Sequence, residues 1–104
     1  RLPPAIGRDL VSISSDLHYL QVVTTRGRAT VLGSLNHVES ELSGQGVRLH
    51  RAHWVSLAHV PRLLKSERGW RCELRDGRRL PVSRRRIGEV RSRLGKDFVV
   101  EEPT

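Results

Sequence analysis

Several residue types and sequence features are rare or absent in this 104-residue chain. Its single cysteine, Cys72, excludes an internal disulfide bond and a zinc site built from several cysteines. Its apolar runs are only a few residues long, far short of the roughly 20 residues that cross a membrane, and no leader resembles a signal peptide. Methionine is absent, and because a complete translated chain begins with methionine, we expect a piece of a longer or processed protein.

Aromatic residues are also scarce, with two tryptophans, one tyrosine and one phenylalanine. These are too few for the aromatic ladder of most single-strand and RNA-binding surfaces, so RNA is disfavoured as a partner. We expect Trp54 and Trp70 to pack in the core and Cys72 to be a small buried apolar residue. Because the sequence has no nucleotide-binding loop and no nucleophile motif, it predicts neither an enzyme nor a cofactor.

Positive charge is the most informative property of the composition. Nineteen basic and eleven acidic residues give a formal net charge of +8, and only Lys65 and Lys96 are lysines. Seven arginines lie between Arg78 and Arg93, with a single acidic residue among them. Arginine binds phosphate and guanine edges through two parallel hydrogen bonds, so the clustering indicates a polyanion and favours nucleic acid. An acidic protein, an anionic membrane surface and a merely solvated face are the alternatives.

The first half of the chain has the alternating pattern of half-buried strands. Residues 1–9 contain two prolines and a glycine, and we expect them to form a linker. Alternation begins at Leu10, and residues 17–32 predict a hairpin that turns at Arg26–Gly27. Apolar residues at helical spacing follow Ser34, which predicts a short helix with this serine as its N-cap.

The second half repeats the order of strands followed by a helix. Residues 47–60 have strand-like composition, and Asp76–Gly77 is the strongest hairpin signal in the chain. Ser83 is the expected N-cap of a second helix that ends at Gly95, and residues 96–104 are expected to be a tail, either a frayed end or a linker scar. The predicted fold class is therefore mainly β, with several hairpins and two short helices. These helices are too far apart in sequence to form a helix-turn-helix.

Four blocks carry most of this pattern. They are SISSDLHYLQVVTTRG (12–27), GSLNHVESEL (33–42), VRLHRAHWVSLAHV (47–60) and LRDGRRLPVSRR (74–85). In this order they resemble the LytTR-type DNA-binding domain of LytR/AlgR-like bacterial transcriptional regulators. The resemblance covers about residues 8–94, and we expect the domain itself to span residues 10–95. The family pattern has Ser and Asn at the positions of Ala52 and Ser56, and both replacements are small.

The resemblance implies a fold, a partner and a context. The family fold is an elongated stack of antiparallel β-sheets with short helices, and it implies sequence-specific binding to double-stranded DNA. Its loops would enter successive major grooves and bend the duplex, often at imperfect direct repeats. Because family members are fused to a receiver domain or to membrane or sensor segments, we expect such a region upstream of this chain. The expected location is the cytoplasm. The resemblance also allows an inner-membrane tether in the full-length protein and a dimer on DNA.

The resemblance also assigns individual residues to DNA contacts. The positions that match the family's base contacts are His18, Arg51 and Arg85. The expected contacts to the DNA backbone come from Arg48, His50, Ser83, Arg84 and Arg86. Histidine and arginine donate hydrogen bonds to guanine N7 and O6, and the N–H groups at a helix start attract phosphate. The alternatives are a turn-capping surface imidazole for His18, a phosphate contact or surface salt bridge for Arg51, and an exposed basic helix face for the three arginines after Ser83. His50 could instead brace the loop that presents Arg51.

His50 and His53 form an H-x-x-H string, which raises the alternative of a metal site. On one strand, residues an odd number apart point to opposite faces, and no acidic residue or cysteine lies close in sequence. We therefore expect no metal at this string. Two other functions stay open. One is a protein-interaction or sensor module whose basic face binds an acidic partner or anionic lipid, and the other is a metal-dependent enzyme that acts on nucleic acid.

Overall fold

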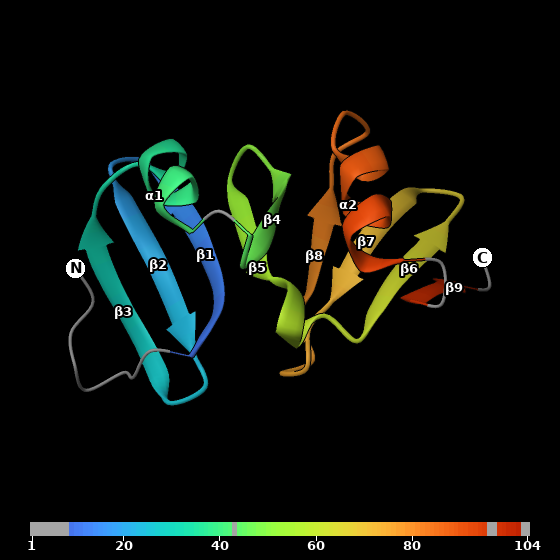
Figure 1. Ribbon diagram of the computed structural model, residues 1–104, viewed down its shortest axis with the longest axis horizontal. Coiled ribbons are helices and arrows are strands. Elements are labelled where there is room, and N and C mark those ends of the chain that lie inside the picture. The colour runs from blue at the N-terminus through green and yellow to red at the C-terminus, as the bar shows by residue number, and fades with distance from the viewer. Residues whose placement is uncertain (1–8, 43, 96–97, 103–104) are drawn as a thin grey trace.

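Two β-sheets lie side by side along the long axis of the molecule (Figure 1). The computed structural model describes residues 9–42, 44–95 and 98–102, and the principal extents are 39 × 24 × 24 Å. The first sheet has the strand order β3 (Gly27–Leu32), β2 (Tyr19–Thr24), β1 (Leu10–Asp16), β5 (His53–Ser56) and β4 (Gly46–His50). The second sheet has the order β8 (Arg79–Val82), β7 (Gly69–Glu73), β6 (Arg62–Ser66) and β9 (Val99–Glu101). The expected mainly β, elongated stack of sheets is confirmed.

The hairpins predicted from turn residues are present. In the β2–β3 hairpin, Thr24 pairs with Gly27, so the turn lies one residue earlier than expected, at residues 25–26. The Asp76–Gly77 turn joins β7 to β8, and the Gly77 N–H donates to the Leu74 carbonyl at 3.0 Å. Local turn chemistry is therefore sufficient to locate these hairpins.

Helix α1 (Leu35–Glu41) begins where its sequence predicts. The Ser34 hydroxyl accepts a hydrogen bond from the His37 backbone N–H at 3.2 Å, which confirms this serine as the N-cap. Leu35 is the buried residue of the helix and joins a core cluster of Ile13, Leu20, Val22 and Trp54 under the first sheet. Burial of this small cluster holds α1 in place, since a seven-residue helix has little stability of its own.

The larger core cluster lies between the two sheets and helix α2 (Ile87–Leu94). Cys72 is fully buried there, as expected, and burial raises the pKa of its thiol to about 12. Trp54 is buried in the other cluster, which confirms its predicted place. Trp70 is partly buried and packs against the larger cluster, and the cations of Lys65 and Arg91 lie 5.5 and 5.2 Å from its ring centroid.

The start of α2 differs from the prediction. The helix begins at Ile87 and not after a Ser83 cap, because residues 84–86 form a separate turn. In that turn the Arg86 N–H donates to the Ser83 carbonyl at 3.0 Å, while the Ser83 N–H donates to Leu49 of β4 at 2.8 Å. The predicted end is confirmed, since Gly95 adopts φ +92° at the C-cap.

A frayed end was one of two expectations for the C-terminal residues, and it is wrong for the described part of them. Val99–Glu101 forms strand β9, which pairs in parallel with β6. The Glu102 N–H donates to the Lys65 carbonyl at 2.8 Å, and Arg71 forms an ion pair with Glu102 at 2.5 Å. The predicted linker over residues 1–8 lies outside the described residues. No helix in the described part of the chain is long and apolar enough to cross a membrane.

Candidate nucleic-acid interface

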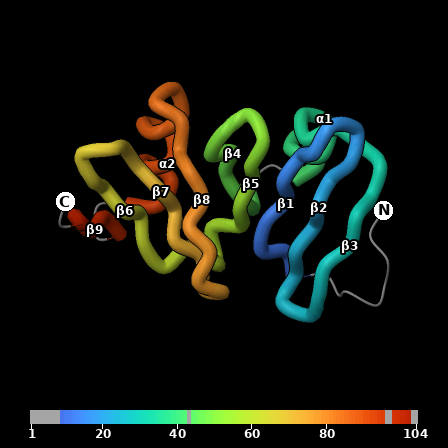
Figure 2. The backbone as a smooth tube through the Cα atoms, turned by 180° about the vertical axis from the view of Figure 1, so that it is seen from behind, coloured from blue at the N-terminus to red at the C-terminus, as the bar shows by residue number. Residues whose placement is uncertain are grey.

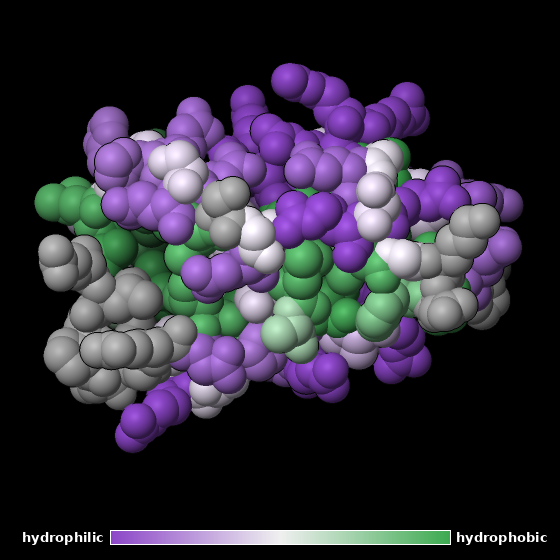
Figure 3. Space-filling model, viewed as in Figure 1, coloured by the Kyte–Doolittle hydropathy of each residue, from purple (hydrophilic) through white to green (hydrophobic). Residues whose placement is uncertain are grey.

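Three loops lie along one long edge of the molecule. They are the β1–β2 loop (residues 17–18), the β4–β5 loop (residues 51–52) and the β8–α2 segment (residues 83–86). Figures 1 and 2 show them on the same edge from opposite sides. We call this edge the loop edge. In Figure 3 most of the side chains along this edge are hydrophilic, so chain segments far apart in sequence form one largely polar surface.

The β1–β2 and β4–β5 loops share an open concavity of about 490 Å³. His18 and Arg51 both line it and both are exposed, so the structure brings together two of the three predicted base-contacting residues. The backbone between β1 and β2 turns at Leu17, which adopts φ +58°, a conformation that side chains other than glycine rarely adopt. The Leu17 side chain is 91% exposed and lines the same concavity.

His50 braces the β4–β5 loop, as one of its two predicted roles required. Its Nδ1 accepts a hydrogen bond from the Ala52 backbone N–H at 3.2 Å. An accepting Nδ1 places the proton of the neutral ring on Nε2, which leaves that nitrogen as a donor. His50 can thus hold the loop and donate to a phosphate with different ring nitrogens.

The H-x-x-H string has a geometry that the strand pattern did not predict. His50 and His53 are paired across a hairpin with residues 51–52 as its turn, and their ring centroids lie 5.7 Å apart. His53 Nδ1 lies 2.8 Å from the Ser14 hydroxyl oxygen. Burial, with smaller contributions from His50 and Arg78, lowers the pKa of His53. Among the described residues no three His, Cys, Asp or Glu side chains converge in a possible metal site.

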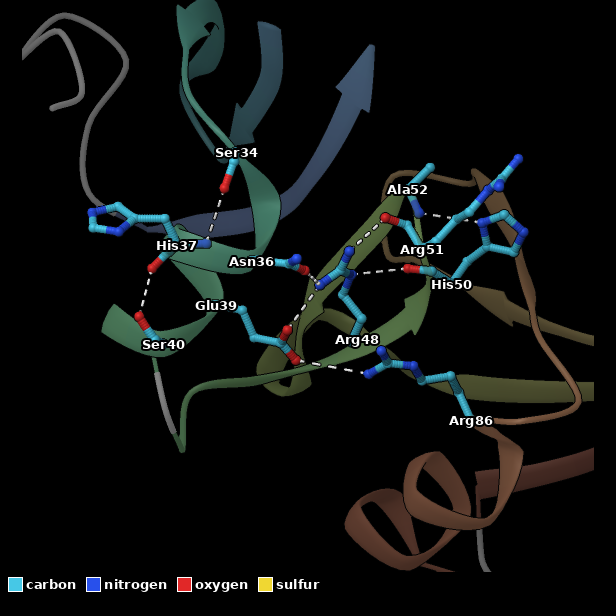
Figure 4. A network of polar contacts seen from close by, with 10 residues as sticks. All are labelled: Ser34, Asn36, His37, Glu39, Ser40, Arg48, His50, Arg51, Ala52 and Arg86. Atoms are coloured by element: carbon cyan, nitrogen blue, oxygen red, sulfur yellow. Dashed lines mark hydrogen bonds and ion pairs between the residues drawn. The ribbon is translucent and has the colours of Figure 1, made fainter. Parts of the chain in front are cut away.

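Arg48 is largely buried, although it lines the same concavity as His18 and Arg51, and its expected contact with the DNA backbone stays a prediction. Its side chain is 6% exposed. Its Nη1 donates to Asn36 Oδ1 and Glu39 Oε1, each at 2.8 Å, and its Nε and Nη2 donate to the carbonyls of His50 and Arg51, at 3.0 and 2.5 Å (Figure 4). A phosphate would have to compete with these four acceptors for the guanidinium.

The β8–α2 segment carries three arginines in different environments. Arg84 and Arg85 are exposed, and within the described parts of the chain neither side chain has a hydrogen-bond or ion-pair partner. Arg86 is less exposed and lies 3.9 Å from the Glu39 carboxylate. All three precede α2, so they belong to a turn and not to the first helical turn that the sequence predicted.

Sequence reasoning missed Asn36 and Glu39, which hold Arg48. They lie three residues apart on α1, a spacing that places both side chains on one face of a helix. This spacing is visible in the sequence, but the arginine that both side chains contact lies nine and twelve residues away on another element. Only the packing of α1 against the first sheet brings Arg48 to these two side chains.

The fold and the cationic loop edge define a small β-sheet domain of the nucleic-acid-binding class. Comparison with known proteins gives its family, because residues 7–95 match the family model of the LytTr DNA-binding domain. The chain belongs to the LytTr DNA-binding domain family, and DNA is its partner. The predicted family membership is confirmed.

Two relatives and one solved structure show how far the similarity extends. The chain is 33% identical over 91 residues to each of two regulators from Paraburkholderia xenovorans (strain LB400), the heme-containing CO-sensing transcriptional regulators RcoM 1 and RcoM 2. The match covers 85% of this chain and 34% of each regulator, so the chain spans about a third of their length. The LytTr domain of a response regulator from Bacillus cereus has the same fold, with a TM-score of 0.76 and 21% identity, over 85% of this chain and 83% of that one.

Proposed function

We propose that this domain binds double-stranded DNA with sequence specificity, as the DNA-binding part of a transcriptional regulator, and that its loop edge contacts one side of the duplex. The observation that carries the proposal is the shared concavity of His18 and Arg51, on the same edge as the arginine-rich β8–α2 segment. Three short loops with exposed donors can enter DNA grooves without a recognition helix.

The size of the molecule supports contacts in successive major grooves. One helical turn of DNA spans about 34 Å, and the long axis of the domain is 39 Å. The β1–β2 loop and the β8–α2 segment lie in different halves of the edge, with the β4–β5 loop between them (Figure 1). Bending of the duplex towards the edge would bring both end loops into contact, at a deformation cost of about 1–6 kcal/mol.

Each group has a role in this proposal. His18, Arg51 and Arg85 donate to base edges in the grooves, where guanine offers N7 and O6 as acceptors. The groups that contact phosphates and set the register are His50, Ser83, Arg84 and Arg86. Arg86 must share or leave its 3.9 Å ion pair with Glu39 to reach a phosphate, so its contribution is the weakest of the arginines. A phosphate contact of Arg48 would have to compete with its four acceptors inside the protein.

The relatives suggest the regulatory context. Both RcoM proteins are named as transcriptional regulators with a sensing function, and this chain matches only about a third of each. We infer that the chain serves the same output role and that signal input lies in other parts of such proteins. Imperfect direct repeats as target, a dimer on DNA and a cytoplasmic location belong to this proposal.

The proposal is tested by selecting bound DNA duplexes from a random pool and then measuring the affinity of the domain for the selected duplex and for a scrambled duplex. Wild type is expected to prefer the selected duplex over a scrambled one. Arg85→Ala is expected to cost about 1–3 kcal/mol on the selected duplex and to relax preference at one position. Arg84→Ala is expected to weaken both duplexes alike and to lower the salt slope by about one.

Arg26→Ala is the matched control, because Arg26 is exposed in the β2–β3 turn on the edge opposite the loop edge. It removes the same charge and is expected to change both affinities by less than twofold. Equal losses from Arg26→Ala and Arg85→Ala would refute the loop edge as the binding surface. Tighter binding to acidic peptides or anionic vesicles than to any duplex would favour a different partner class.

A further inference from the structure

Glu39 connects two loops of the proposed DNA-binding edge through one carboxylate group. Its Oε1 accepts from Arg48 Nη1 at 2.8 Å, and its Oε2 lies 3.9 Å from Arg86 Nη1. Arg48 belongs to β4, which leads into the β4–β5 loop, and Arg86 belongs to the β8–α2 segment. Figure 4 shows the three side chains meeting between α1, β4 and the start of α2. We call these three residues the Glu39 network.

Arg48 controls the conformation of the β4–β5 loop through backbone contacts. Its donors bind the carbonyls of both His50 and Arg51, so both carbonyls point towards the guanidinium. The pairing of β4 with β5 shifts in register between Arg48 and His50, and the guanidinium sits at this irregularity. Figure 4 shows the Arg51 side chain directed away from the network, towards the outside. The loop thus holds two carbonyls towards Arg48 and the Arg51 side chain on its outer side.

The β8–α2 segment is attached at the same place. The Ser83 N–H donates to the carbonyl of Leu49, the neighbour of Arg48, at 2.8 Å. The 3.9 Å ion pair between Arg86 and Glu39 adds a second connection a few residues further on. The position of this segment relative to the β4–β5 loop therefore depends on β4 and on the Glu39 carboxylate.

The chemistry of the site favours a positioning role over a purely stabilising one. A buried ion pair offsets its own desolvation cost, so it adds little stability compared with apolar packing, but it requires defined geometry. The planar guanidinium of Arg48 donates in several fixed directions at once, which a lysine ammonium cannot reproduce. A base contact tolerates displacements of only a fraction of an ångström, so loop position matters more to selectivity than to phosphate binding.

We propose that the Glu39 network sets the position of the β4–β5 loop relative to the β8–α2 segment and so determines base discrimination without touching a base. Arg48 and Glu39 are positioning residues for Arg51 and Arg85. This inference rests on the proposed function, because it needs a loop edge that reads bases. It adds residues that lie beneath the DNA-binding surface.

Arg48→Lys is the first test, because it keeps the charge and removes the fork of donors. The measurements are the dissociation constants for the selected and scrambled duplexes, the salt slope and the thermal unfolding of each variant. Arg48→Lys is expected to lose at least tenfold in affinity for the selected duplex. Its affinity for the scrambled duplex is expected to stay within twofold of wild type, with the salt slope unchanged.

A position-resolved readout separates positioning from general destabilisation. Duplexes selected by Arg48→Lys are expected to lose preference at the base pairs that Arg51→Ala also relaxes, and to keep the preference lost in His18→Ala. Equal losses for both duplexes, or a preference profile like wild type, would overturn the proposal. If wild type itself shows no preference between duplexes, the proposed function fails and this inference fails with it.

Glu39→Gln is a second variant in case Arg48→Lys does not fold. It keeps the shape of the side chain and removes the charge that both arginines share. Glu41→Gln is the matched control, because Glu41 is exposed on the same helix and its carboxylate lies 3.9 Å from His37, outside the network. Glu39→Gln is expected to reduce discrimination several-fold, and Glu41→Gln is expected to leave it unchanged. Equal discrimination in the two variants would overturn the proposal.

Discussion

Replacement of Arg48 by methionine isolates the energetic role of the buried guanidinium. Methionine keeps a long unbranched stem and removes the charge and all its donors. The acceptors left behind are Asn36 Oδ1, Glu39 Oε1 and the carbonyls of His50 and Arg51. We expect the variant to fold with a clearly lower free energy of unfolding, because these acceptors lose a charged partner.

The structure sets the size of the loss. Hydrogen bonds to charged groups contribute about 1.5–3 kcal/mol each, and removal of one partner of a buried ion pair costs about 3–5 kcal/mol. Glu39 keeps 37% of its side chain exposed, so water replaces part of what Arg48 supplied. We therefore expect the low end of the range, about 3 kcal/mol, for Arg48→Met. For a domain of this size that corresponds to a Tm lower by roughly 12–24 °C.

Urea unfolding at pH 7, followed by tryptophan fluorescence, measures this change directly. Arg51→Met is the matched control, because it makes the same replacement three residues away on an exposed side chain. It is expected to change the free energy of unfolding by less than about 0.5 kcal/mol. A loss below about 1 kcal/mol for Arg48→Met, or equal losses for the two variants, would refute the assigned role of the guanidinium.

Three further predictions concern other parts of the structure. Burial lowers the pKa of His53 in the folded protein, so the unfolded chain binds its proton first as the pH falls below about 6.5. The free energy of unfolding therefore includes the full contribution of the neutral ring above pH 6.5, and this contribution is lost as the pH falls towards the lower pKa of the folded state. Urea unfolding at a series of pH values should show this decrease in wild type and a smaller decrease in His53→Gln. Leu17→Gly should raise the free energy of unfolding by about 0.5–1 kcal/mol, because glycine tolerates φ +58° and the leucine side chain is exposed. A lower free energy of unfolding in this variant would contradict backbone strain at the turn. Gly46→Ala should lower the free energy of unfolding by about 1–3 kcal/mol, because a Cβ at residue 46 would collide with the Trp54 indole and the Val55 carbonyl of β5. An unchanged Tm for this variant would contradict the close approach.

Local chemistry made much of the fold predictable. Ser34 caps α1 because its hydroxyl is close to the N–H groups that need an acceptor, and Gly95 ends α2 because it tolerates positive φ. Both signals depend on residues within a single helical turn. The Ser83 prediction was wrong because residues 84–86 form a turn, in which the Arg86 N–H donates to the Ser83 carbonyl, and the helix begins only at Ile87. A cap signal in the sequence does not show that a separate turn stands between the serine and the helix.

The candidate site was predictable only in part. His18 and Arg51 were named because they match the base-contacting positions of the resembled family, and the structure leaves both side chains exposed. The burial of Arg48 was not predicted, because a lone arginine in a basic block gives no indication that a helix will cover it. Its acceptors come from α1 and from the β4–β5 loop, and those contacts form only when the helix packs on the sheet.

Composition and short-range pattern were thus enough to predict the mainly β class, the hairpins and the preference for a polyanion, and the resemblance of four sequence blocks added the family. Tertiary structure alone decided that three loops share one edge, that residues 99–101 join the second sheet and that one glutamate lies between two arginines. The physical reason is the range of the interactions. Turns and caps form between neighbours in sequence, whereas strand pairing and buried ion pairs join groups that meet only after the chain has packed.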